Sequence, residues 1–182
     1  MYRRIRHRRQ SAQTNYRKRF ASLKGGMARV VVRKSNKAVT MQVLKYGESG
    51  DVVLASVNSR ELRSMGWEPR CNIPTAYLTG LLLAKKVKGK ERDFVLDIGL
   101  YRPVKGSVIF AAAKGFKDNG ANLHSGIEFD EKRLSGAHIA SYANSADENE
   151  YKSRFSTYIK AGFDVKAIDK KFEGVKKELM SK

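Results

Sequence analysis

Arginine side chains dominate the first 24 residues, and their type and spacing suit the binding of phosphate. The segment MYRRIRHRRQSAQTNYRKRFASLK contains nine Lys or Arg residues and no carboxylate. A guanidinium group contacts phosphate through two parallel hydrogen bonds, and aromatic rings beside it can stack on unpaired bases. A solubilising or import tail is the alternative interpretation. We expect the following arm residues to contact RNA: Arg3, Arg4, Arg6, Arg8, Arg9, Tyr16, Arg17, Lys18, Arg19 and Lys24.

Two smaller groups of basic and aromatic residues lie outside this segment. A tight Ser-Asn-Lys turn between two predicted strands should present the first group toward RNA at a sheet edge. That group comprises Arg33, Lys34, Asn36, Lys37 and Lys45. The second group, Tyr101, Arg102 and Lys105, lies in the loop YRPVKG, where Pro103 cannot continue a strand ladder. We expect this loop to form a second RNA contact distant from the arm, and a connector with solvated charges is the alternative.

Carboxylates and histidines form no recognisable catalytic pattern. A ribonuclease-H-like nuclease needs clustered carboxylates for two metal ions, one of them on the first strand, but the first predicted strand, RVVVRK, has none. We expect Asp97, in the apolar run FVLDIGL, to accept hydrogen bonds from backbone or Arg donors. The histidines, His7, His124 and His138, match no metal-binding spacing, and His124 is either an RNA contact or a capped loop residue. We therefore expect no enzymatic activity, metal or cofactor, with a nuclease as the competing hypothesis.

The distribution of charge supports a nucleic-acid partner. The chain has 182 residues and a net charge of +19, and residues 1–47 contain 14 Lys or Arg and no Asp or Glu. A membrane surface is the third hypothesis, but residues 1–24 lack an amphipathic basic helix with an apolar face, and no apolar run is long enough to span a bilayer. The single cysteine, Cys71, excludes an intramolecular disulfide, is expected to be buried or half-buried, and favours a cytoplasmic location.

Hydrophobic periodicity predicts an α/β fold. Short β-branched runs at 29–34, 38–46 and 51–57 predict a three-stranded antiparallel meander. The apolar run at 94–100 predicts a further strand, which can pair in parallel with the third through a right-handed crossover. Helices are predicted at 58–66, 72–88 and 107–119, and the first starts with Asn58 and Glu61 at capping-box spacing. This order, with helices packed on the sheet, suggests a ribonuclease-H-like or translational-machinery topology.

The rest of the chain is predicted to be a helical C-terminal tail. A short helix is expected at 134–143, followed by a polar break at 144–150. Apolar residues then recur at spacings of three and four, namely Val165, Ile168, Phe172, Val175 and Leu179. Such a stripe is expected to pack on its own domain, with docking on a partner as the alternative. The predicted organisation is an arm at 1–26, an α/β domain at 27–126 and an extension at 127–182.

Six segments, in this order, resemble a known family. They are TNYRKR (14–19), RVVVRKSNK (29–37), GDVVLASVNSREL (50–62), AYLTGLLLAKK (76–86), LDIGLYRPVKG (96–106) and FAAAKGFKDNGANLHSG (110–126). Together they resemble the archaeal and eukaryal form of large-subunit ribosomal protein eighteen, the 5S-RNA-binding family, and the tail favours the archaeal form. One departure is Asn122-Leu123, where the family leads us to expect a proline.

The resemblance implies a scaffold in the cytoplasmic ribosome. Its implied partners are 5S rRNA, 23S rRNA and neighbouring large-subunit ribosomal proteins in the central protuberance. It implies that the chain does not bind a membrane and is not a homo-oligomer. It also implies that the arm and one side of the sheet hold the 5S rRNA.

Overall fold

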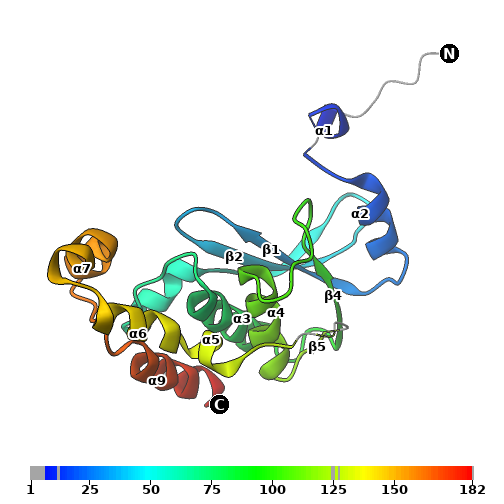
Figure 1. The fold of residues 1–182 in the computed structure, drawn as a ribbon. Helices are drawn as coiled ribbons and strands as arrows, with labels where there is room; N and C mark the ends of the chain where they lie inside the picture. The colour runs from blue at the N-terminus through cyan, green and yellow to red at the C-terminus, as the bar shows by residue number, and fades with distance from the viewer. Residues whose placement is uncertain (1–6, 12, 124–125, 127, 182) are drawn as a thin grey trace.

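A mixed sheet with the strand order β3-β2-β1-β4-β5 organises the chain in this computed structural model, which describes residues 7–11, 13–123, 126 and 128–181 (Figure 1). The strands are β1 (Ala28–Lys34), β2 (Val39–Lys45), β3 (Val52–Asn58), β4 (Asp93–Asp97) and β5 (Asn122–Leu123). β2 runs antiparallel to β1 and β3, whereas β4 is parallel to β1 and β5 to β4. The α/β class is therefore confirmed, while the short strand β5 was not predicted.

The predicted pairing of the fourth strand with the third is wrong, because β4 pairs with β1. This arrangement places β1 at the centre of the sheet, where its first five residues are all buried. β3 remains at an edge, and its Val52 and Val53 are exposed. β4 also ends at Asp97 rather than continuing to residue 100, since Gly99 turns the chain with a φ of +62°.

Two helices, α3 (Ile73–Val87) and α4 (Val108–Asp118), cover one face of the sheet. Asn72 begins α3 by accepting a hydrogen bond from the Thr75 amide at 3.1 Å. The two helices cross at glycines: a Cβ at Gly80 would collide with the carbonyl oxygen of Ala112, and one at Gly115 with that of Tyr77. This close approach keeps the helix layer compact above β1 and β2.

A 3₁₀ helix, η1 (Ser59–Met65), replaces the α-helix predicted at 58–66. The expected capping box is present: the Asn58 side chain accepts from the Arg60 amide, and Glu61 accepts from the Asn58 amide at 2.9 Å. Gly66 ends η1 in the left-handed conformation, with a φ of +72°. The boundaries of this element are thus those predicted, although its hydrogen-bonding pattern is tighter.

The C-terminal helices share one hydrophobic core with the sheet. They are α5 (Glu131–Ser135), α6 (Ala137–Ser145), α7 (Glu148–Arg154), α8 (Ser156–Lys160) and α9 (Ile168–Met180). All five stripe residues of the predicted final helix are buried, and Phe172 contacts the rings of Trp67 and Tyr77. Packing on its own domain is therefore confirmed. The predicted polar break at 144–150 is wrong at its end, because α7 begins there, with Glu148 and Glu150 favourably placed at its N-terminus.

The arm contains two helices, α1 (His7–Gln10) and α2 (Tyr16–Leu23). Asn15 begins α2 by accepting a hydrogen bond from the Lys18 amide at 3.1 Å. None of the residues of α2 is buried. α2 nevertheless lies against the sheet beside β4 (Figure 1), with Tyr16, Arg19, Ser22 and Leu23 half-buried.

Candidate RNA interface

The two faces of the sheet differ in chemistry because side chains alternate along β1. Val30 and Val32 point into the helix layer, whereas Arg29 and Arg33 point to the opposite face. Asp97, at the end of β4, lies beside these arginines. The face that α3 and α4 leave uncovered therefore carries charged groups, and α2 of the arm lies over it.

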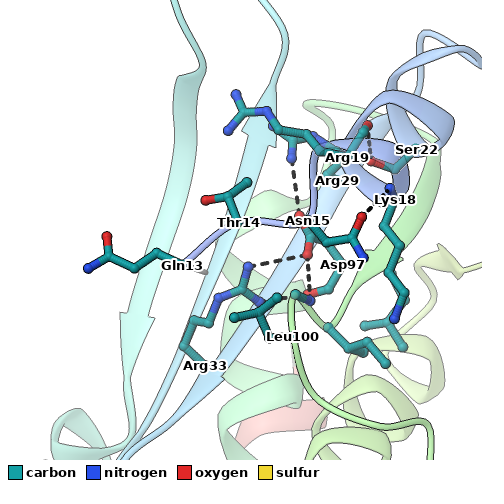
Figure 2. Close-up of a pocket in the computed structure, with 13 residues that line it drawn as sticks. Gln13, Thr14, Asn15, Lys18, Arg19, Ser22, Arg29, Arg33, Asp97 and Leu100 are labelled. Atoms are coloured by element: carbon teal, nitrogen blue, oxygen red, sulfur yellow. Dashed lines mark hydrogen bonds and ion pairs between the residues drawn. The ribbon is translucent and has the colours of Figure 1, made fainter. Parts of the chain in front are cut away.

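A pocket of about 240 Å³ lies between α2 and this face of the sheet (Figure 2). The arm contributes Gln13, Thr14, Asn15, Lys18, Arg19 and Ser22, the strand β1 contributes Arg29 and Arg33, and the opposite wall is formed by residues 96–100. The volume is below the roughly 300–1,000 Å³ of pockets that enclose a drug-sized ligand. Its basic and amide side chains suit a single polar, anionic group.

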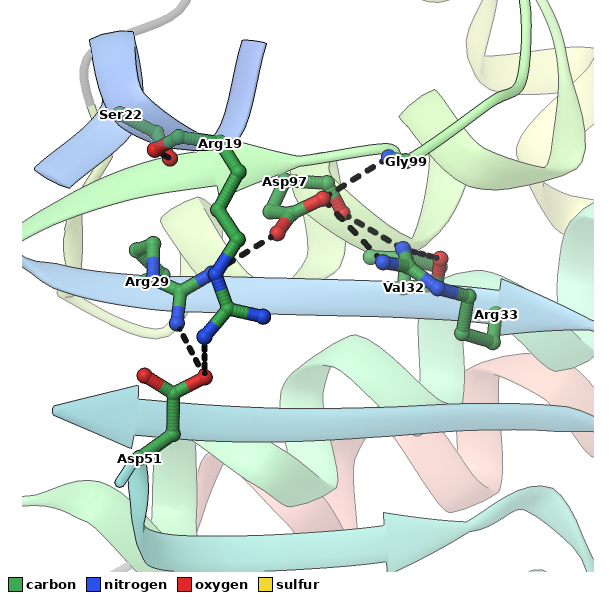
Figure 3. Close-up of polar contacts among 8 residues, drawn as sticks. All are labelled: Arg19, Ser22, Arg29, Val32, Arg33, Asp51, Asp97 and Gly99. Carbon is green, nitrogen blue, oxygen red and sulfur yellow. Dashed lines mark hydrogen bonds and ion pairs between the residues drawn. The ribbon is translucent and has the colours of Figure 1, made fainter. Parts of the chain in front are cut away.

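Three arginines and two carboxylates form a continuous chain of ion pairs behind the pocket (Figure 3). Asp51 Oδ2 lies 2.8 Å from Arg19 Nη2 and 2.7 Å from Arg29 Nη2. Asp97 Oδ2 lies 3.1 Å from Arg29 Nη1, and Asp97 Oδ1 lies 3.2 Å from Arg33 Nη2. The three arginines and two carboxylates together have a net charge of +1. This cluster of ion pairs therefore still attracts an anion.

Arg29 is the buried centre of this chain, with its side chain 3% exposed. Its Nη2 atom is close to Asp51 but lacks hydrogen-bond alignment, and Arg29 Nε and Asp51 Oδ1 are buried without a hydrogen-bond partner among the described residues. Arg29 therefore acts on Asp51 mainly through its charge, whereas its Nη1 donates a hydrogen bond to Asp97. The expectation that Asp97 accepts from Arg and backbone donors is confirmed, since it accepts from Arg29, Arg33 and the Gly99 amide.

The predicted turn and loop lie next to each other. Tyr101 Oη donates a hydrogen bond to the carbonyl of Lys34 at 2.9 Å, and the Lys34 amine lies 5.7 Å from the centre of the Tyr101 ring. Lys34, Asn36, Lys37, Arg102 and Lys105 are all exposed. The loop also begins at the pocket, because Gly99 and Leu100 line it together with the arm. Tyr101, Arg102 and Lys105 are not among the residues that line the pocket, so the expected separation of this loop from the arm stays a prediction.

Lys45 is not near the turn, contrary to prediction. The register of β1 and β2 pairs Lys34 with Val39 and Arg29 with Leu44, so Lys45 lies at the opposite end of β2. Its amine forms an ion pair with Glu91 at 2.5 Å. A hairpin turn brings only the residues that flank it together, and each further residue along a strand adds about 3.3 Å.

The remaining predicted arm residues are placed unevenly. Tyr16, Arg17 and Lys18 belong to α2, and Lys24 ends it, with its amine 5.9 Å from the centre of the Phe20 ring. Arg8 and Arg9 belong to α1, but their side chains lie outside the described structure, as do Arg3, Arg4, Arg6 and His124.

Asp51 is a functional candidate that the sequence interpretation left out of the interface, whereas Phe20 is one of the arm aromatics that the interpretation considered able to stack on bases. Phe20 is 65% exposed on α2, as a ring that stacks on bases must be. Asp51 faces the arm only because of tertiary packing, and no local pattern marks it. Arg29 and Arg33 are four residues apart on one strand, which is a signal that they share a face.

Within the described ranges, no three His, Cys, Asp or Glu side chains are grouped so that they could hold a metal ion. Cys71 is half-buried as predicted, and burial raises the pKa of its thiol while the charge of Lys34 opposes that rise. None of the described helices combines the length and apolar character needed to cross a membrane.

Comparison with known proteins gives a consistent result across the chain. A sequence model of the family described as "Ribosomal large subunit proteins 60S L5, and 50S L18" matches residues 1–93. Large ribosomal subunit protein uL18 of Methanococcus maripaludis is 43% identical over 180 residues, covering 96% of this chain and 93% of the relative. Large ribosomal subunit protein uL18 of Thermofilum pendens is 40% identical over 179 residues, covering 94% and 91%. The similarity thus includes the arm, the sheet and the C-terminal helices.

Proposed function

This chain belongs to the family of ribosomal large subunit proteins that includes 60S L5 and 50S L18, and on that premise we propose that it binds 5S rRNA and helps attach it to the large subunit. Membership makes it an archaeal-type component of the large subunit of the cytoplasmic ribosome, a structural protein and not an enzyme. The finer proposal is that it contributes to the central protuberance and contacts 23S rRNA and neighbouring ribosomal proteins.

The proposal rests on the contact region between α2 of the arm and the uncovered face of the sheet. We call this region, which includes Arg19, Arg29 and Arg33, the seam. Arg19 and Lys18 from α2 and Arg33 from β1 line one pocket. Arginines held by carboxylates keep further N–H donors for phosphate, since a guanidinium has five. Phe20, exposed on the same helix and in contact with Lys24, offers a ring for an unpaired base. Phosphate contacts and a stacking face in one place suit a folded RNA rather than a small ligand.

The residues that we propose to contact RNA follow from this seam and from its neighbours. They are Arg3, Arg4, Arg6, Arg8, Arg9, Tyr16, Arg17, Lys18, Arg19 and Lys24 of the arm, Arg33, Lys34, Asn36 and Lys37 at the turn, and Tyr101, Arg102, Lys105 and His124. The ion pair of Lys45 with Glu91 makes it the weakest member of the predicted set.

The strand order and directions support a further proposal about the fold. β2 alone among the described strands runs against the others, and the order is β3-β2-β1-β4-β5. This is compatible with a ribonuclease-H-like sheet whose first strand carries no carboxylate, which suits a protein that binds RNA without cleaving it.

The test is a direct comparison of two RNAs. The purified full-length chain is titrated with 5S rRNA and with a size-matched transfer RNA at several salt concentrations, by fluorescence anisotropy. Non-specific binding to phosphate weakens steeply as salt rises, so a preference for 5S rRNA should become clearer at higher salt. Equal affinity for the two RNAs at every salt concentration would contradict the proposal.

A further inference from the structure

Two carboxylates lie where the chain is expected to meet a polyanion. Asp51 and Asp97 line or border the seam, and each side chain is 17% exposed. The chain carries a net charge of +19, and its first 47 residues contain no acidic group at all. A carboxylate near RNA phosphate repels it, so charge alone gives no reason for either residue to be there. Their contacts provide a different reason.

Asp51 connects the arm to the sheet. It lies directly before β3, and its Oδ2 atom contacts Arg19 of α2 at 2.8 Å and Arg29 of β1 at 2.7 Å. α2 has no fully buried residue, and the side it turns to the body, with Tyr16, Ser22 and Leu23, is only half-buried. The ion pair of Arg19 with a fixed carboxylate therefore helps to set where the arm helix lies and how it is turned.

Asp97 connects β1 to the loop that follows β4. Its Oδ1 atom accepts from the Gly99 amide at 2.8 Å and from Arg33 Nη2 at 3.2 Å. Arg33 Nη1 also donates to the carbonyls of Asp97, at 3.0 Å, and Val32, at 2.8 Å. These bonds hold the guanidinium of Arg33 in one orientation while its side chain remains 45% exposed.

Gly99 completes this arrangement. Its φ is +62°, a conformation that favours glycine, and a Cβ there would lie 3.0 Å from Cζ of Arg33. The guanidinium of Arg33 therefore lies against the backbone of the loop. The loop leads to Tyr101, which in turn contacts Lys34 at the turn.

Arg29 joins the two carboxylates into one unit. Its Nη1 contacts Asp97 and its Nη2 contacts Asp51, and it is almost fully buried. A displacement of one carboxylate would leave a buried charge less well paired, which is costly. Ion pairs and hydrogen bonds through Asp51, Arg29 and Asp97 therefore link the arm, the strand β1 and the loop at Gly99, as Figure 3 shows.

We propose that Asp51 and Asp97 are positioning residues of the RNA interface, which fix Arg19, Arg33 and the loop at Gly99 in the arrangement that the RNA meets. This inference rests on the proposed function. Holding the binding groups in place before association reduces the ordering that binding must otherwise impose. The carboxylates thus favour one RNA geometry over others, at the expense of some general attraction for phosphate.

Two explanations of these carboxylates predict opposite signs. If only charge matters, Asp97→Asn and Asp51→Asn remove repulsion and strengthen binding to every RNA. If the carboxylates position the arginines, each change weakens binding to 5S rRNA by about tenfold, in the range expected for a lost charge-assisted hydrogen bond. Affinity for transfer RNA then stays the same or rises, so discrimination between the two RNAs falls.

The matched control is Glu91→Gln. It removes a carboxylate of similar exposure, 24%, which pairs with Lys45 and not with the arginines of the seam. It should leave the affinity for 5S rRNA unchanged or slightly raised. Full-length chains are compared by fluorescence anisotropy against both RNAs, with thermal unfolding of each variant recorded in parallel.

A second variant keeps the test informative if Asp97→Asn unfolds. Arg33→Lys retains the positive charge but cannot make the same three hydrogen bonds, and it should also weaken binding to 5S rRNA selectively. The proposal is overturned if both Asp variants bind 5S rRNA as tightly as the parent or more tightly, in parallel with Glu91→Gln.

Failure of the proposed function is recognised separately, in the parent chain. A parent that binds 5S rRNA and transfer RNA equally contradicts the function. In that case the positioning role is tested on the non-selective affinity of the parent for RNA. The Asp variants should lower this affinity, and Glu91→Gln should not.

Discussion

The arm helix α2 and the C-terminal helix α9 lie at opposite ends of the chain and are attached to the same body by different forces. α9 buries Ile168, Phe172, Val175 and Leu179 in the common core. α2 buries no side chain and is tied by the ion pair of Arg19 with Asp51. Burial of a large apolar side chain is worth about 1.5–3 kcal/mol, whereas a partly exposed ion pair is worth about 0–1 kcal/mol and is screened by salt.

This difference indicates that the two helices, α2 and α9, serve different purposes. A helix attached by apolar burial is part of the fold and stays in place whatever the solvent contains. A helix attached by ion pairs is held in a defined position, yet phosphates can compete for its arginines. The following predictions test this contrast, beginning with the largest expected effect.

Phe172→Ala should destabilise the protein by about 3–5 kcal/mol, because it leaves a cavity where the rings of Trp67, Tyr77 and Phe172 meet. Thermal and denaturant unfolding measure the loss. The matched control is Phe20→Ala in α2, which should change stability by no more than about 0.5 kcal/mol, since that ring is exposed. Similar losses from the two changes would show that α2 is attached like α9.

Deletion of Met1 to Lys24 should leave a folded body with much weaker RNA binding. It removes nine Lys or Arg residues, and if about half of them meet phosphates, the slope of log affinity against log salt should fall by roughly 3 to 5 units. Stability should fall by only about 1 kcal/mol, the upper range for a lost partly exposed ion pair. An unchanged salt slope would mean that the arm does not contact RNA.

Arg102→Ala should weaken RNA binding in both the full-length and the arm-deleted protein. Because residues 99–100, directly before this loop, line the pocket with the arm, the two losses should not simply add. We expect a coupling of at least about 0.5 kcal/mol, measured as a double-mutant cycle on RNA affinity. Strict additivity would support the interpretation of two distant contacts, and no loss in either background would exclude the loop from the interface.

The double change Lys34→Ala and Lys37→Ala should have only a small effect on stability. Exposed positions usually shift stability by about 0.5 kcal/mol or less, and the contact of Lys34 with the Tyr101 ring adds about 0.5–1 kcal/mol. RNA affinity should fall, with a salt slope reduced by up to about 2 units. A loss of stability well above this range, with RNA affinity retained, would mean that the turn is structural.

Local sequence signals predicted the elements whose formation is decided within a few residues. Asn58 with Glu61, and Asn72 before its helix, satisfy amide groups of the adjacent turn, so their capping roles are independent of the rest of the fold. The apolar stripe from Ile168 to Leu179 likewise has its period set by helix geometry, whereas Val165, predicted to belong to the same helix, lies before α9. The basic arm and a nucleic-acid partner were predicted from the distribution of charge along the sequence, which does not depend on the fold.

Tertiary structure decided how these parts meet. The sequence allowed β4 to join either free edge of the antiparallel strands, and only packing of the whole sheet selected β1. Arg29 and Asp97 are 68 positions apart and Arg19 and Asp51 are 32 apart, so no local period brings either pair together. The seam, the role of its two carboxylates and the closeness of residues 99–100 to the arm therefore exist only in the folded chain, because long-range contacts depend on which strands become neighbours.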